Sequence, residues 1–90
     1  MDTPAATTTL SALAHQARLD IFRTLLRHGE LPAGELATEL GIPSSTLSFH
    51  LKDLRIAGLI VSRRQGRHLL YRADRDRLAE LMAFLMAFPA

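Results

Sequence analysis

The 90-residue sequence contains no cysteine and no tryptophan, and aromatic residues make up only 6% of it. Without cysteine the chain can form no disulfide, thiolate metal site or thiol redox switch. It has no apolar run long enough to span a bilayer and no segment patterned as a signal peptide, so we expect a cytoplasmic protein with no membrane association. Glycine-rich phosphate loops and nucleophile motifs are also missing, and we therefore expect neither an enzyme nor a cofactor.

The formal net charge is only +2, but the charges are unevenly distributed. Residues 1–43 carry three arginines and five acidic residues, whereas residues 44–77 carry eight basic and three acidic residues. A concentration of positive charge in one half of a small chain is typical of a phosphate-binding surface. From charge alone, a solvated arginine-rich surface explains the pattern equally well.

The stretch from Glu35 to Gly58 has the spacing of a helix-turn-helix. Ala37 is small where two helices would cross, Gly41 tolerates the left-handed backbone that ends the first helix, and Leu47 supplies an apolar plug. These positions predict helices over 33–40 and 44–57, with the second helix reading DNA.

The second helix has two distinct faces. Leucines at 47, 51 and 54 form one stripe, which we expect to be buried. The opposite stripe holds two hydroxyls, an aromatic ring and a cation, from Ser45, Ser48, Phe49 and Lys52. Hydroxyls can bond base edges or phosphates, and a ring can contact a thymine methyl group, so this stripe suits a major groove.

After Gly58 the pattern changes to branched and aromatic residues, which predicts a two-stranded hairpin of about 59–64 and 67–73 around Gln65-Gly66. Arg63, Arg64, Arg67 and His68 crowd its tip. Such a basic tip beside a reading helix resembles a wing that contacts phosphates or a minor groove. The alternative is an edge hairpin that charge protects from aggregation.

The outer segments carry more apolar surface than one small domain easily covers. We expect a frayed start over 1–6, helices over about 7–14 and 16–28 with a break near His15, and a last helix from Asp74 or Asp76 to Phe88. Pairing the first and last helices of two protomers would bury this surface, although it could also be ordinary intrachain core. The expected dimer-interface residues are Leu10, Leu13, Leu78, Leu81, Met82, Leu85 and Met86.

The chain resembles the ArsR/SmtB family of bacterial winged-helix repressors over residues 8–86, most specifically in STLSFHLKDLRIAGLI and SRRQGRHLLYR. The length and the residue patterns predict a single domain over 1–90, mainly α with a two-stranded β-hairpin, in the order of four helices, two strands and a helix, and the resemblance implies the same winged helix-turn-helix fold. It also implies a homodimeric repressor that leaves an imperfect palindrome when an inducer binds. Together the patterns and the resemblance give as DNA-binding residues Ser44, Ser45, Thr46, Ser48, Phe49, His50, Lys52, Arg63, Arg64, Arg67 and His68.

The sensing motifs of the family do not carry over to this chain. Pro32-Ala33-Gly34 stands where arsenic sensors place cysteines, and the last helix has acidic residues but no histidine. None of the four histidines lies at i, i+4 from another, so we expect no metal site formed by one chain, while a site shared across a dimer stays open and the inducer is unassigned. A different class of function also stays open, a winged-helix protein-interaction module in which Phe49 meets a protein partner.

Overall fold

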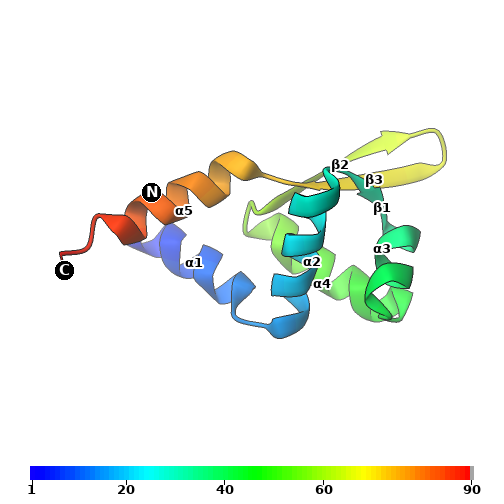
Figure 1. Cartoon of the computed structure of the whole chain (residues 1–90), viewed down its shortest axis with the longest axis horizontal. Helices are drawn as coiled ribbons and strands as arrows, with labels where there is room; N and C mark the ends of the chain where they lie inside the picture. The colour runs from blue at the N-terminus through cyan, green and yellow to red at the C-terminus, as the bar shows by residue number, and fades with distance from the viewer. Residues whose placement is uncertain (90) are drawn as a thin grey trace.

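The computed structural model describes residues 1–89, which form five helices and a small sheet (Figure 1). The fold is a mainly α winged helix-turn-helix. Its elements in chain order are α1 (Thr3–Leu13), α2 (Gln16–His28), β1 (Leu31–Pro32), α3 (Ala33–Leu40), α4 (Ser44–Ile56), β2 (Ile60–Gln65), β3 (His68–Ala73) and α5 (Arg75–Met86).

The sheet has three antiparallel strands in the order β1-β3-β2. The predicted hairpin of β2 and β3 is present, but the sequence did not predict the third strand, β1. The additional strand β1 pairs Leu31 with Tyr71 and Pro32 with Leu70. Two residues, one of them a proline that donates no backbone hydrogen bond, carry no alternating pattern that would predict a strand. This strand exists because the fold brings the segment to the edge of β3.

Helix α1 begins earlier than expected. It starts at Thr3 because the Asp2 carboxylate accepts a hydrogen bond from the Ala5 backbone N–H at 2.9 Å, and Pro4 lies in the first turn. An aspartate followed by a proline is a signal for a helix start, so the prediction of a frayed segment over 1–6 was wrong. The predicted break near His15 is present between α1 and α2.

The core lies where α2, α3 and α4 meet the sheet. Helix α2 contributes Ile21, Phe22 and Leu25 to this core. Against them pack Leu36 and Ala37 of α3 and the predicted leucine stripe of α4, all of which are buried. Gly41 has φ of +65°, and the following N–H of Ile42 bonds back to the Ala37 carbonyl at 3.1 Å. This αL ending turns the chain sharply enough to start α4 three residues later.

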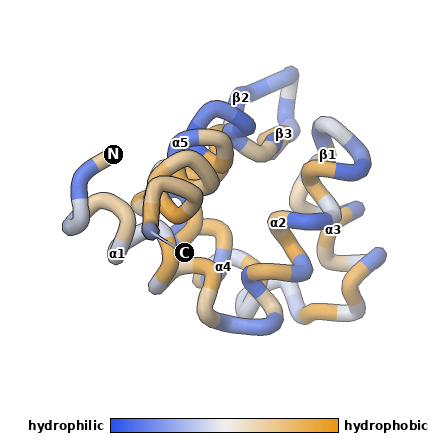
Figure 2. Tube along the Cα trace, turned by 60° about the vertical axis from the view of Figure 1, so that its left-hand side comes forward, coloured by the Kyte–Doolittle hydropathy of each residue, from blue (hydrophilic) through white to orange (hydrophobic). Residues whose placement is uncertain are grey.

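The chain is elongated, with extents of 45 × 23 × 21 Å. Helices α1 and α5 lie at one end and the β2–β3 hairpin projects at the other (Figure 1). Seen from a second side, apolar residues recur along α5 (Figure 2). Of the expected interface residues, Leu81 is buried in this chain, Leu13 and Leu78 pack partly against its core, and the exposed ones are Leu10, Met82, Leu85 and Met86.

Candidate nucleic-acid interface

Helix α4 turns its polar stripe outward. Leu47, Leu51 and Leu54 are buried, as predicted, and this fixes which residues face solvent. The exposed residues include Ser44, Ser45, Thr46, Ser48, Phe49 and Lys52. Phe49 is 73% exposed, so its ring is accessible to a ligand that approaches this face of α4.

The first turn of α4 has no side-chain cap. Its N-cap residue is Pro43, whose side chain offers no hydrogen-bond acceptor to the backbone amides of that turn. The Ser48 hydroxyl instead donates to the Ser44 carbonyl at 3.0 Å. Unpaired amides at the start of the helix can therefore be satisfied by solvent or by an anionic ligand, and the Ser48 oxygen still has acceptor capacity.

His50 lies on a different side of α4 from Phe49. It is half-buried, and its Nδ1 accepts a hydrogen bond from Arg18 Nε at 3.3 Å. The ring of His15 lies next to it, with centroids 6.4 Å apart. His50 therefore contacts residues at the junction between α1 and α2, unlike the exposed serines at the start of α4.

The hairpin formed by β2 and β3 has the expected basic tip, with the turn one residue later than predicted. Gln65 pairs with His68, so Gly66 and Arg67 form the turn. Arg64, Arg67 and His68 are all exposed. Their side chains are free to contact a phosphate backbone, which needs flexible cations rather than a rigid pocket.

Arg63 differs from its neighbours because it is already paired. Its Nε and Nη2 donate to the two carboxylate oxygens of Glu30 at 2.8 and 2.7 Å. The hydrogen bonds from Arg63 hold the pKa of Glu30 below its ordinary value of 4.5. Sequence reasoning missed this partner because 33 positions separate the two residues. Arg63 is thus paired midway along the wing, whereas Arg64, Arg67 and His68 nearer the turn are exposed.

A hollow of about 430 Å³ lies between the wing and the helix-turn-helix. It brings together Ser48 of α4, Arg64 and Arg67 of the wing, and the backbone at Gly34 near the start of α3. Three segments that the sequence separates therefore converge on one basic concavity. Tyr71, which sequence reasoning did not assign to the site, lines the same hollow.

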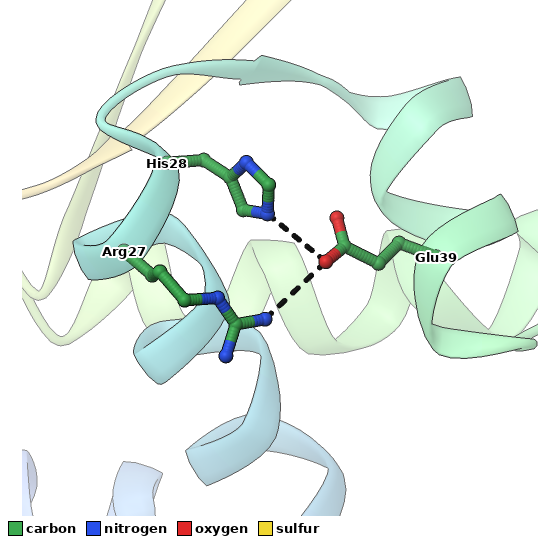
Figure 3. A network of polar contacts seen from close by, with 3 residues as sticks. All are labelled: Arg27, His28 and Glu39. Atoms are coloured by element: carbon green, nitrogen blue, oxygen red, sulfur yellow. Dashed lines mark hydrogen bonds and ion pairs between the residues drawn. The ribbon is translucent and has the colours of Figure 1, made fainter.

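A second polar network connects the helices behind the interface. His28 at the end of α2 lies 2.9 Å from Glu39 of α3, and Arg27 donates to the same carboxylate oxygen at 3.2 Å (Figure 3). The hydrogen bond to His28 is the largest of the effects that lower the pKa of Glu39. The network joins the ends of two core helices at the surface.

Two further kinds of site bear on function within residues 1–89, a metal centre and a membrane-spanning helix. No group of three or more histidine, aspartate and glutamate side chains in this part of the chain is arranged to hold a metal ion. None of the helices over the same residues is both long and apolar enough to cross a membrane.

Comparison with known proteins assigns this arrangement to a family. The family described as "Helix-turn-helix domain" matches residues 13–63. An ArsR-like transcriptional regulator from Rhodococcus sp. RHA1 superposes with a TM-score of 0.86 at 29% identity, covering 92% of this chain and 77% of that one. The chain belongs to the ArsR/SmtB family of winged-helix proteins.

Two further relatives support the assignment of this ArsR/SmtB protein. The biofilm growth-associated repressor of Agrobacterium fabrum is 42% identical over 78 residues, covering 87% of this chain and 66% of the relative. A homodimeric winged helix-turn-helix DNA-binding domain from Mycobacterium bovis has a TM-score of 0.80 at 28% identity, over 92% of this chain and 77% of that one. The chain spans 57% to 66% of the length of the curated relatives that it matches.

Proposed function

We propose that this protein is a sequence-specific DNA-binding transcriptional regulator, acting as a homodimeric repressor at an imperfect palindrome. Helix α4 would enter the major groove, and Arg64, Arg67 and His68 of the wing would contact the backbone or the minor groove. The observation that carries the proposal is the basic hollow that joins the wing to the polar face of α4. Its similarity to the biofilm growth-associated repressor of Agrobacterium fabrum supports the same function.

The proposal includes a cytoplasmic location and no catalytic activity, as the sequence predicts. The proposed DNA-binding residues are those expected from the sequence, but two of them have a different role. Arg63 is paired with Glu30, and His50 is bonded to Arg18, so both would support the reading surface before they contact DNA. Ser45, Phe49 and Lys52 remain the exposed candidates for direct contact.

The experiment is selection of bound duplexes from random DNA, followed by titration of the selected site at several salt concentrations. Arg64→Ala and Arg67→Ala should each weaken binding to all sequences and reduce the slope of log K against log salt by about 0.9 for each protomer, or about 1.8 for the dimer. Arg23→Ala is the matched control, since Arg23 is exposed on α2, outside the hollow. Failure to enrich any sequence would refute the proposal and favour a protein-interaction module.

The dimer is tested separately. Met82 and Met86 of α5 are 53% and 82% exposed, a costly arrangement for large apolar side chains unless another surface covers them. Met82→Glu should shift the protein from dimer to monomer in sedimentation experiments and weaken binding to the full palindrome more than to an isolated half-site. A wild-type protein that sediments as a monomer at all concentrations would refute this part of the proposal.

A further inference from the structure

Arg18 occupies a central position behind the reading helix. Its Nε donates to His50 Nδ1 at 3.3 Å, its Nη2 lies 2.9 Å from an Asp53 carboxylate oxygen, and its Nη1 donates to the Ala12 carbonyl at 3.5 Å. One guanidinium thus contacts the end of α1 and two residues of α4 from its own place near the start of α2.

This arginine is not available to bind a phosphate. Its side chain is 15% exposed, and each of its three nitrogens already has a partner within the protein. A hollow of about 340 Å³ adjoins the pair with Asp53, so packing fills only part of the surrounding space. Directional hydrogen bonds, rather than close packing alone, therefore determine where the guanidinium lies.

The two contacts on α4 are placed to control its rotation. His50 and Asp53 are three residues apart, so they lie on adjacent turns of one helical face. The buried leucine stripe of α4 sets which face of the helix is outward, and holding the helix at two further points from a rigid planar group limits small rotations about the helix axis. These rotations decide how Ser45 and Phe49 are presented to a DNA groove.

The hydrogen bond to His50 also selects a tautomer. Arginine has donors only, so His50 Nδ1 must act as the acceptor, and the neutral ring then carries its hydrogen on Nε2. We propose that Arg18 is a positioning residue for DNA reading, which fixes the rotation of α4 and presents His50 as an Nε2–H donor. This inference rests on the proposed DNA-binding function. The single N–H of the half-exposed ring suits a phosphate oxygen or a base acceptor.

The first test uses the wild-type protein free of DNA. Long-range ¹H–¹⁵N spectra at mildly alkaline pH distinguish the two neutral tautomers of each histidine. We expect the Nε2–H form for His50, with an Nδ1 resonance shifted by the accepted hydrogen bond; that shift should be lost in Arg18→Met, with Arg23→Met as the matched control that leaves the ring signals unchanged. A wild-type His50 in the Nδ1–H form would overturn the inference.

The second test separates positioning from direct contact. Arg18→Met should weaken binding to the selected site about tenfold, the size expected for one misaligned hydrogen bond, and change binding to random DNA less than twofold. Its salt slope should equal that of the wild type, because no phosphate contact is lost. A slope lower by about 0.9 for each protomer, or about 1.8 for the dimer, with equal losses on all duplexes, would identify a phosphate contact and overturn the inference.

A further variant keeps the test decisive if Arg18→Met does not fold. Asp53→Asn removes the ion pair but leaves the bond to His50, so selectivity should fall while the His50 ring signals stay as in the wild type. Unchanged selectivity in this variant would contradict the inference that Arg18 positions α4 through its contacts with both His50 and Asp53. If the wild type itself selects no sequence, the proposed function fails as well, whereas a selective wild type with the wrong His50 tautomer overturns only this inference.

Discussion

Replacing Gly58 by alanine should destabilise the protein more than replacing Gly41 by alanine. Both glycines follow a helix of the helix-turn-helix with positive φ, +78° at Gly58 and +65° at Gly41. At the end of α4, the Leu59 N–H bonds to the Leu54 carbonyl and the Gly58 N–H to the Arg55 carbonyl, both at 3.0 Å. This is a Schellman motif, which requires the left-handed backbone.

The magnitude follows from two terms. An alanine in the left-handed region costs about 1–2 kcal/mol, and this term applies to both positions. At Gly41 the added methyl group would meet no atom within 4 Å, whereas at Gly58 it would lie 3.2 Å from Arg77 Nε. Arg77 would have to move, so Gly58→Ala should carry an additional cost. Each kcal/mol corresponds to a fall in Tm of about 4–8 °C for a domain of this size.

Urea unfolding at one fixed protomer concentration measures both costs, because association would otherwise change the apparent stability. The decisive comparison repeats the two substitutions in an Arg77→Ala background. There Gly58→Ala and Gly41→Ala should cost nearly the same, since the crowding side chain is gone. Equal costs in the wild-type background, or a difference that persists without Arg77, would refute the reasoning.

Three further predictions concern the interface and the core. Glu30→Gln should release Arg63 for phosphate contact, which raises the salt slope of DNA binding by about 0.9 for each protomer, or about 1.8 for the dimer; an unchanged slope in a titration would show that Arg63 gains no such contact. Leu54→Ala should cost about 2–5 kcal/mol in urea unfolding because Leu54 is fully buried, and a loss below 1 kcal/mol would contradict its core position. The hydrogen bond to His28 lowers the pKa of Glu39 below 4.5. The ionised Glu39 carboxylate therefore adds to the free energy of unfolding above pH 4.5, and this contribution is lost as the pH falls through the folded-state pKa. The Tm difference between wild type and Glu39→Gln should therefore shrink below pH 4.5, and a difference independent of pH would argue against the contact.

The helix-turn-helix was predictable because its determinants are local. Ala37, Gly41 and Leu47 act within one short segment, and the leucine stripe of α4 follows from helical periodicity. The basic wing was visible for the same reason, since both strands are adjacent in sequence. The early start of α1 could also have been read from Asp2 and Pro4, whose spacing is a local helix-start signal.

Contacts between distant segments required the tertiary structure. The sequence by itself determined the order of the helices, the outward stripe of α4 and the arginines of the wing, because period and turn residues encode them locally. The fold decided that β1 joins the sheet, that Glu30 holds Arg63, and that Arg18 contacts the reading helix. Such pairings depend on three-dimensional packing across long sequence separations, for which a single sequence carries no periodic signal.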